Sequence, residues 1–275
     1  MTMWKRRELV RATAVAALLL QVLAPSRAGG QVEAFRHDPA RVPVGRIYEY
    51  VKSNRDGSNA SRISLHVAGP DRLESLKWVP GDTVASLVVA TMDWSRFSVR
   101  RLESWVLVRG AAPTLRAALE ADSSGAGVRV SFAPDSLLPI RGWPWHSYDF
   151  DFASLNLTLA DLLQPEAPFT FQRADIVYSE SWPPFADIGP VNVRFVRREQ
   201  RSGLDVRVYQ LDGPGLQDQL GRMWVSVTGS YVVEYEFPFP DEPGYTDVRL
   251  QLDRIRRATA AEWDELKRTR VSGRP

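Results

Sequence analysis

Hydrophobic and polar residues alternate with a period of two along most of this chain, which is the pattern of strands with one buried face. In residues 62–67, for example, Ile63, Leu65 and Val67 occupy every second position. Turn-forming clusters such as Asp56-Gly57-Ser58 separate the alternating segments. The pattern predicts about eleven strands, joined mostly by hairpins and therefore antiparallel. Further alternating segments are residues 128–132, 191–195, 204–208, 231–237 and 248–252.

Two segments differ from this simple alternation. Residues 87–90 are apolar at every position, which predicts a strand that is covered on both faces. Residues 114–121 carry an apolar side chain at every second position, although their Ala- and Leu-rich composition also fits a short helix. We interpret residues 114–121 as a strand.

Two segments have the periodicity and end signals of helices. In residues 154–163 one helical face carries Leu155, Leu159, Leu162 and Leu163, and Pro165 follows where the helix would end. The sequence Thr259-Ala260-Ala261-Glu262 is a capping box, which predicts that a C-terminal helix begins there. Trp263 and Leu266 supply the apolar face of that helix.

These elements predict a mainly β protein. We expect a large curved antiparallel sheet, either a half-barrel or a barrel-like sandwich, with one internal helix and a short C-terminal helix. No flexible low-complexity stretch separates two units, so residues 29–275 are expected to form a single β-rich domain.

The first 28 residues have the order of a secretory signal peptide. Lys5, Arg6, Arg7 and Arg11 form a basic start, and residues 12–24 form an apolar run too short to span a bilayer comfortably. Small residues precede a cleavage site after Ala28. We therefore expect a periplasmic or secreted protein, with no transmembrane segment after signal cleavage.

Charge and cysteine content narrow the classes of partner. Of the 35 basic and 33 acidic residues of the chain, 30 and 32 lie beyond residue 28, which leaves a net charge of −2. Nucleic acid and anionic membrane surfaces are therefore not expected as electrostatic partners. Because the chain has no cysteine, it lacks a lipobox and is not a lipoprotein, and it forms neither disulfides nor thiolate metal sites.

The sequence contains no signature of catalysis, a metal or a cofactor. There is no thiol and no Gly-x-Ser-x-Gly nucleophile elbow. His37, His66 and His146 are isolated, without the spacing that brings two ligands to one metal ion. No glycine-rich loop is present that could hold a phosphate. We expect a protein that is not an enzyme, with no catalytic residue, metal or cofactor.

Residues 142–152 hold the densest group of polar and aromatic side chains. In an extended conformation Asp149 and Asp151 would project to one face, near His146, and a sugar ring could stack on Trp143 or Trp145. In the alternative interpretation, Asp151 caps the following helix and the aromatic residues fill the core. The second interpretation is favoured, because neighbouring carboxylates on one strand do not grip a substrate from two sides.

A ligand site, if present, is predicted on aromatic and apolar residues of the inner face. The aromatic residues of the last strands could line a pocket or fill a core, and the sequence does not separate these two arrangements. The predicted ligand-binding residues are Trp143, Trp145, His146, Tyr148, Leu155, Leu159, Trp224 and Tyr235.

Three stretches of the chain carry a family resemblance. They are Tyr48-Glu49-Tyr50 through Asp56-Gly57-Ser58 to Ile63-Ser64-Leu65, the run His146-Ser147-Tyr148-Asp149-Phe150-Asp151 entering Ala153-Ser154-Leu155-Asn156, and Leu211-Asp212-Gly213-Pro214-Gly215-Leu216 with Gly221-Arg222-Met223-Trp224. With them the chain resembles exported β-rich proteins of unknown function and, more distantly, the lipoprotein-carrier superfamily of the bacterial envelope.

The resemblance implies a half-open barrel in which a curved sheet holds an acyl chain against helices. The site would then be a concave apolar face covered by the helix at residues 154–163, with no catalytic residue. The low helix content of this chain differs from the closest carriers, which use several helices as a lid.

Three functional hypotheses follow. The first is an exported, non-enzymatic binding or carrier module for a lipid or other amphiphile of the cell envelope. The second is a structural domain that binds an envelope protein, for example through an exposed strand edge. The third is a carbohydrate hydrolase that uses Asp149 and Asp151, which would need a further polar group from another strand.

Overall fold

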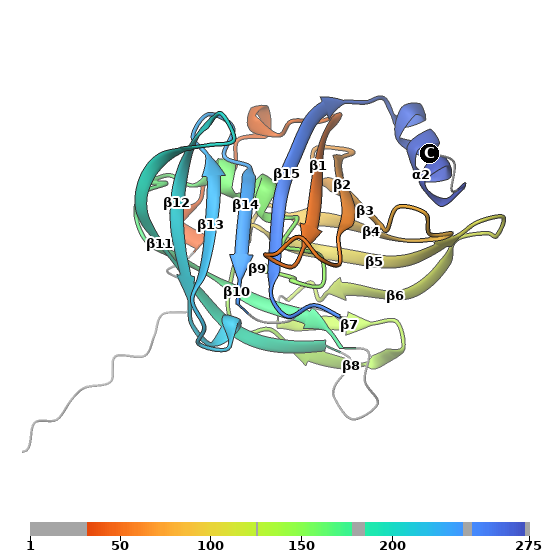
Figure 1. The fold of residues 1–275 in the computed structure, drawn as a ribbon. Coiled ribbons are helices and arrows are strands. Elements are labelled where there is room, and N and C mark those ends of the chain that lie inside the picture. Colours follow the sequence, from red (N-terminus) through yellow and green to blue (C-terminus); the bar gives the residue numbers. More distant parts are fainter. Residues whose placement is uncertain (1–31, 125, 178–184, 239–243, 273–275) are drawn as a thin grey trace, which may run out of the picture.

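The computed structural model describes residues 32–124, 126–177, 185–238 and 244–272. The signal peptide predicted at residues 1–28 lies outside the described residues. Within them, fifteen strands form one sheet in the order β8-β7-β6-β5-β4-β3-β2-β1-β15-β14-β13-β12-β11-β10-β9 (Figure 1). The strands are β1 (Arg46–Ser53), β2 (Ser61–Val67), β3 (Arg72–Trp78), β4 (Val84–Asp93), β5 (Ser98–Val108), β6 (Thr114–Ala121), β7 (Gly127–Val130), β8 (Ala133–Pro139), β9 (Trp145–His146), β10 (Phe169–Ile176), β11 (Phe185–Arg201), β12 (Leu204–Asp212), β13 (Gly221–Ser226), β14 (Val232–Phe237) and β15 (Val248–Arg257).

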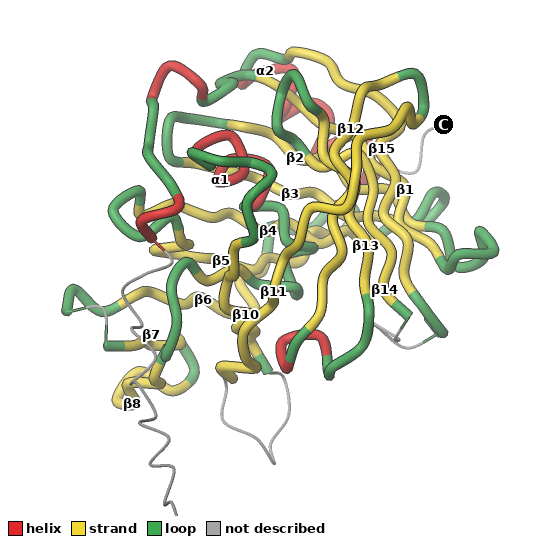
Figure 2. The backbone as a smooth tube through the Cα atoms, turned by 90° about the vertical axis from the view of Figure 1, so that its left-hand side faces the viewer, coloured by secondary structure: helices red, strands yellow, loops and turns green. Residues whose placement is uncertain are grey.

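The strand order shows how two halves of the chain share the sheet. From β1 the chain adds strands outward to β8, then crosses to β9 and returns strand by strand to β15, which pairs with β1. All described neighbours are antiparallel except β9 and β10, which are parallel. The sheet bends so strongly that β4–β8 run across the direction of β12–β15 (Figures 1 and 2). It stays open, with β8 and β9 at its edges.

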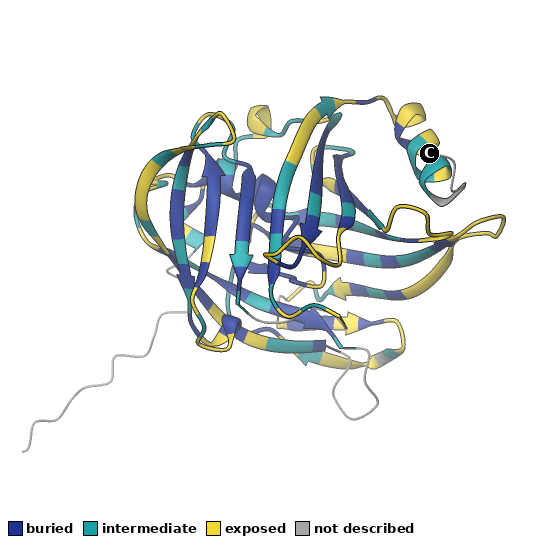
Figure 3. Cartoon of the chain, viewed as in Figure 1, coloured by how far each residue is buried: buried dark blue, intermediate teal, exposed yellow. Residues whose placement is uncertain are grey.

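Most of the hydrophobic core lies on the inner face of this bend. Two short helical segments, α1 (Leu155–Thr158) and η3 (Leu159–Asp161), pack there, and their leucines 155, 157 and 159 are buried. Figure 3 shows the buried residues concentrated on the strands around them. The fold class expected from the sequence is therefore confirmed: a curved, mostly antiparallel sheet with an internal helix.

The C-terminal helix α2 (Ala260–Ser272) covers part of the opposite face, over β3 and β4. Its capping box forms as predicted, since Thr259 N donates to Glu262 Oε2 at 2.7 Å and Glu262 N donates to Thr259 Oγ1 at 3.3 Å. The apolar run of β4 is consequently covered on both faces. Val88 and Ala90 contact the inner core, whereas Leu87 and Val89 belong to the cluster under α2.

The described residues form more strands and a shorter internal helix than the pattern predicts. β9 contains only two residues, and its pairing with β10 rather than any periodicity defines it as a strand. The helix expected over residues 154–163 consists of one α-helical turn followed by a 3-10 segment. Three further 3-10 segments are η1 (Val32–Ala34), η2 (Pro39–Arg41) and η4 (Pro214–Leu216).

Candidate functional site

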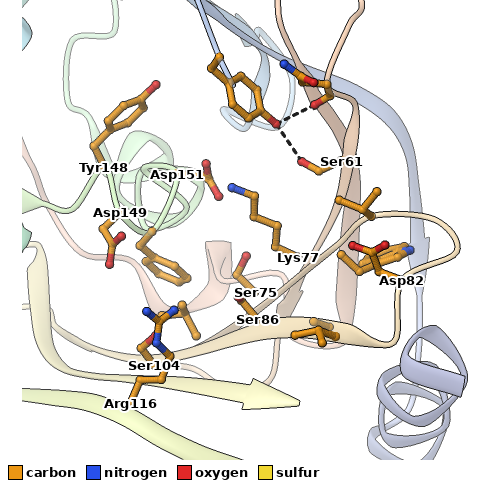
Figure 4. Close-up of a pocket in the computed structure, with 18 of the residues that line it drawn as sticks. Ser61, Ser75, Lys77, Asp82, Ser86, Ser104, Arg116, Tyr148, Asp149 and Asp151 are labelled. Carbon is orange, nitrogen blue, oxygen red and sulfur yellow. Dashed lines mark hydrogen bonds between the residues drawn. The ribbon is translucent and has the colours of Figure 1, made fainter. Parts of the chain in front are cut away.

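A cavity of about 750 Å³ lies against the inner face of the first half of the sheet (Figure 4). Strands β2–β6 form one wall, and the segment from Tyr148 to Asp151 faces them. Its lining residues are Asn59, Ala60, Ser61, Ser75, Lys77, Trp78, Val79, Asp82, Val84, Ala85, Ser86, Val88, Ser104, Arg116, Tyr148, Asp149, Phe150, Asp151 and Tyr245.

Four serines explain why the inner face of the sheet leaves a cavity at this place. Each of the neighbouring strands β2, β3, β4 and β5 contributes one serine to the wall, and these are Ser61, Ser75, Ser86 and Ser104. Farther along the same strands, larger apolar side chains such as Leu65, Leu73 and Leu102 are buried in the core. Since a serine side chain fills little volume, the inner face is solid at the leucine end and open at the serine end.

The segment opposite the serines is held by one carboxylate, that of Asp175 on β10. Its Oδ1 accepts hydrogen bonds from Tyr148 N at 2.6 Å, Asp149 N at 3.2 Å and Ser147 Oγ at 3.0 Å. Its Oδ2 accepts from Arg173 Nε at 2.6 Å. Asp175 is itself buried, so these bonds fix the backbone from which Asp149 and Asp151 project.

A buried ion pair lies beside the cavity and includes one of its lining residues, Asp151. Lys52, on the inner face of β1, donates to Oδ1 of Asp151, and the two side chains are only 1% and 7% exposed. Figure 4 shows that Lys77, on β3, also points its ammonium group toward Asp151. One carboxylate therefore faces two lysines that come from different strands.

The outer end of the cavity combines a polar contact with apolar side chains. The hydroxyl of Tyr245 donates to the Asn59 carbonyl oxygen at 2.9 Å and lies 3.4 Å from Ser61 Oγ. Val79 and Val84, at the end of the β3–β4 hairpin, are 44% and 47% exposed. The cavity thus offers hydroxyl and charged groups on its wall and apolar groups at its rim.

The structure places Asp149 and Asp151 in the same cavity, but in a different way from the one the sequence suggested. The segment is not extended: Asp151 and Phe152 have left-handed backbone conformations, each with φ of +51°. Asp151 does not cap α1, whose N-cap is Ser154 without a side-chain capping bond. The Asp151 carboxylate pairs with Lys52 instead.

Of the eight predicted ligand-binding residues, Tyr148 lines this cavity. Seven of the eight, all but Trp143, are buried, and Trp143 is partly buried under the guanidinium group of Arg96, which lies 4.7 Å from its ring. Trp224 stacks with Arg201 at 4.1 Å and donates to Glu199 at 2.7 Å. The six buried residues that do not line the cavity are Trp145, His146, Leu155, Leu159, Trp224 and Tyr235.

His146 is a neutral core residue in this arrangement. It has no exposed surface, and its Nδ1 shares a hydrogen bond of 2.7 Å with Ser154 Oγ. Its Nε2 has no hydrogen-bond partner among the described residues. Burial lowers the pKa of His146 to about 3, because a charged imidazolium would be stripped of water there.

Sequence reasoning missed Lys52, Lys77, Asp175 and the four serines. One signal was present: Lys52 continues the inward-facing series of Tyr48 and Tyr50 on β1, where a charged residue is unexpected. The serines carried no such signal, because a serine in a strand does not indicate whether its position lies on the exposed face or on the inner face.

Two features are absent from the described part of the chain, a cluster of metal-ligating side chains and a helix suited to a bilayer. It contains no group of three or more histidine, aspartate or glutamate side chains that could hold a metal ion. Nor does any helix there combine the length and apolar composition needed to cross a bilayer.

Comparison with known proteins finds similar solved structures but no family. No family model matches the chain, and no curated protein matches it. The chain is similar to a crystal structure of a domain provisionally assigned as an outer membrane lipoprotein-sorting protein from Vibrio parahaemolyticus. The match covers 90% of this chain and 100% of that chain, with 11% sequence identity and a TM-score of 0.24. Such a TM-score does not establish a shared fold, so the cavity is interpreted from its own residues.

Proposed function

We propose that this protein is an exported, non-enzymatic binding module that holds one small amphiphile in the cavity between β2–β6 and the Tyr148–Asp151 segment. The observation that carries the proposal is the set of four serines on the neighbouring strands β2, β3, β4 and β5. It leaves about 750 Å³ open on a face that apolar side chains fill elsewhere. This volume is in the range of sites that bind small organic ligands, about 300–1,000 Å³.

The two kinds of lining favour a ligand with two kinds of surface. Hydroxyl and charged groups of β2–β6 can bind a polar head, while Val79, Val84 and Val88 offer contacts to an apolar part. A purely apolar ligand would make no use of the hydroxyl groups that Ser61, Ser75, Ser86 and Ser104 present to the cavity. An amphiphile can contact both the polar and the apolar part of the lining.

The contacts of the charged groups support binding rather than catalysis. Asp151 is neutralised by Lys52, and the Asp175 carboxylate is occupied by backbone N–H groups and Arg173. Groups engaged in this way position a segment but are poorly placed to transfer protons. Export rests on the signal peptide predicted from residues 1–28.

The proposal is tested by native mass spectrometry of residues 29–275, purified gently from the native cell envelope. We expect an additional mass that extracts into organic solvent. In Ser86→Leu, which fills the cavity, this mass should be lost, whereas Ser123→Leu at an exposed turn should retain it. A protein that carries no added mass and binds neither a neutral nor an anionic amphiphile in calorimetric titration would refute the proposal.

A second candidate, hydrolysis of envelope carbohydrate, is favoured by one observation. Asp149 and Asp151 line the same cavity, and Lys77 from another strand points toward Asp151 (Figure 4). If the protein cleaves envelope polysaccharide, Asp149→Asn should abolish the release of reducing ends in protein that remains folded. Full release of reducing ends by Asp149→Asn would exclude this role.

A further inference from the structure

Two adjoining cavities lie where β1 begins and β15 ends, at the upper end of these strands in Figure 1. Their volumes are about 570 Å³ and 490 Å³, and both are lined by Arg46, Thr228, Gly229 and Arg257. We call the two together the arginine cleft. It lies at the opposite end of β1 from Lys52, so it is separate from the cavity of the proposed function.

The charged side chains of the arginine cleft are all positive. Among the described residues that line it there is no aspartate, glutamate or lysine, and its charged residues are Arg41, Arg46, Arg256 and Arg257. Two of these have carboxylate partners outside the lining. Arg41 lies 3.3 Å from Asp38. Arg256 donates to Glu49 at 2.8 Å, and Arg254 donates to the same carboxylate.

The other two arginines have no counter-charge. Neither Arg46 nor Arg257 forms an ion pair with a described residue, and the polar side chain that interacts with Arg46 is the neutral phenol of Tyr48. Two positive charges of the arginine cleft are therefore not balanced by a carboxylate of the described chain.

The register of the sheet places these two arginines directly opposite each other, Arg46 on β1 and Arg257 on β15. Opposite residues of antiparallel strands share a face and have Cβ atoms about 5 Å apart, so like charges at such positions repel. Beside the pair, Ala258 N donates to the Gly45 carbonyl oxygen at 2.9 Å, which holds the two strand ends together. An anion between the two guanidinium groups would replace their repulsion by attraction.

The turn between β13 and β14 adds neutral donors to the arginine cleft. Thr228, Gly229 and Ser230 line it. Gly229 N donates to Ser226 Oγ at 3.2 Å and Ser230 N donates to the Ser226 carbonyl oxygen at 3.0 Å, so the turn is held in shape. The hydroxyls of Thr228 and Ser230 can each donate one further hydrogen bond.

The number of unbalanced charges favours a phosphate monoester over a carboxylate. A phosphate monoester carries a charge of about −1.5 to −2 at pH 7 and three acceptor oxygens. Each guanidinium group can donate two parallel hydrogen bonds to such oxygens. A carboxylate has one charge and two oxygens, so it would leave one of the two arginines without a counter-charge.

We infer that the arginine cleft binds a phosphate monoester group, held between the guanidinium groups of Arg46 and Arg257 beside the Thr228–Ser230 turn. The inference goes beyond the proposed function, because it assigns a second site to the chain. The phosphate group belongs either to a small soluble molecule or to the head of a phospholipid, and both offer the same oxygens to the arginines.

The soluble source is tested with glycerol 1-phosphate, and glycerol serves as the neutral control. Both are titrated into residues 29–275 by calorimetry at low ionic strength, where screening of the arginines is weak. If the source is soluble, glycerol 1-phosphate binds with a dissociation constant of about 1 mM or less, and glycerol does not bind.

The lipid source is tested with vesicles in a flotation assay. Vesicles of phosphatidylcholine mixed equally with phosphatidic acid are compared with vesicles of phosphatidylcholine alone. If the source is a lipid, the protein floats with the phosphatidic acid vesicles only, and free glycerol 1-phosphate does not bind.

Substitutions assign the binding to the arginine cleft. Arg257→Gln should weaken it about tenfold, the usual effect of removing one charge-assisted hydrogen-bonding group, and Arg46→Gln/Arg257→Gln should abolish it. Arg100→Gln is the matched control, because Arg100 is an exposed arginine of β5 that lines neither cavity. It should bind as the unmodified protein does.

Two results would overturn the inference. One is the absence of binding to both glycerol 1-phosphate and the phosphatidic acid vesicles. The other is an equal loss of binding in Arg257→Gln and Arg100→Gln, which would reflect a general attraction to the surface. Neither result bears on the amphiphile cavity.

A measurement on the unmodified protein covers the case in which the variants fail to fold. Nuclear magnetic resonance follows the backbone amides while inorganic phosphate is added. The amides of Arg46, Gly229 and Arg257 should shift, and shifts confined to other parts of the chain, or none at all, would also overturn the inference.

Discussion

Lys52 on β1 and Asp151, 99 residues later in the chain, form an ion pair that is almost excluded from solvent. The ammonium group also lies 5.6 Å from the ring centre of Tyr148 and 5.9 Å from that of Tyr245. The pair therefore ties the first strand of the sheet to the segment that closes the cavity. Removal of either partner would leave a charge buried in a site from which water is largely excluded.

We predict that Asp151→Asn lowers the free energy of unfolding by about 3 kcal/mol, because it removes the buried carboxylate that Lys52 contacts. Asparagine adopts the left-handed backbone conformation of this position readily, so the substitution tests the charge rather than the turn. Urea denaturation measures the effect. In the double variant Lys52→Met/Asp151→Asn, much of the loss should be recovered, and a loss equal to that of Asp151→Asn alone would contradict this account.

Asp175 should matter for stability although it does not line the cavity. Asp175→Ala removes the acceptor of two backbone N–H groups and of the Ser147 hydroxyl, and each unsatisfied group costs about 1–3 kcal/mol. We expect a loss of about 3 kcal/mol or more, with faster hydrogen exchange at the amides of Tyr148 and Asp149.

The matched control for Asp175 is an aspartate in an exposed ion pair. Asp253 pairs with Arg62 at 3.0 Å, and both side chains are about half exposed, at 51% and 44%. Asp253→Ala should therefore cost no more than about 1 kcal/mol. Similar losses for Asp175→Ala and Asp253→Ala would show that Asp175 does not organise the segment.

His146 should make the protein sensitive to acid. Its pKa in the folded protein, about 3, lies below the ordinary value of 6.5, so the folded state binds fewer protons than the unfolded state between these values. Its stabilising contribution is complete above pH 6.5 and is lost as the pH falls toward 3, by about 1.4 kcal/mol for each pH unit.

The variant His146→Gln isolates this effect from that of the carboxylates. Glutamine can keep one hydrogen bond to Ser154 but does not titrate. The free energy of unfolding, measured in urea at pH 7, 6, 5 and 4, should fall less steeply for His146→Gln than for the unmodified protein. Parallel pH dependences of the two proteins would rule out a neutral, buried His146.

Trp263 should anchor the C-terminal helix. It is 2% exposed, stacks on His66 with ring centres 4.9 Å apart, and donates from Nε1 to Glu74 Oε2 at 2.7 Å. Trp263→Ala should lower the free energy of unfolding by about 3–5 kcal/mol, the usual cost of emptying a buried tryptophan site. Trp263→Phe, which keeps most of the packing, should cost clearly less, and equal losses would argue that packing contributes little.

Much of the fold could be read from local patterns. The strand of residues 114–121 is β6 with the predicted bounds, and the Thr259–Glu262 capping box begins α2. These elements depend on side chains two to four positions apart, whose preferences act in any context. Strands such as β9 could not be predicted, because two residues carry no periodicity and their partner lies more than 20 residues away.

The candidate site was only partly foreseen. Tyr148, Asp149 and Asp151 were singled out from sequence and do line the cavity. The turn that points them there depends on Asp175, which follows in a separate strand. Most of the other predicted residues are buried, as is common for aromatic and leucine side chains, and their role in ligand binding stays a prediction.

By itself, the sequence determined that alternate residues share a face, that the strands are mostly antiparallel, and that α2 begins at its capping box. Only the tertiary structure decided which face turns inward, where the sheet bends, and that four serines on neighbouring strands fall side by side to leave a cavity. The physical reason is the separation along the chain of the residues that each feature requires. Strand and cap preferences are properties of a few consecutive residues, whereas a cavity and the Lys52–Asp151 pair exist only when distant segments meet.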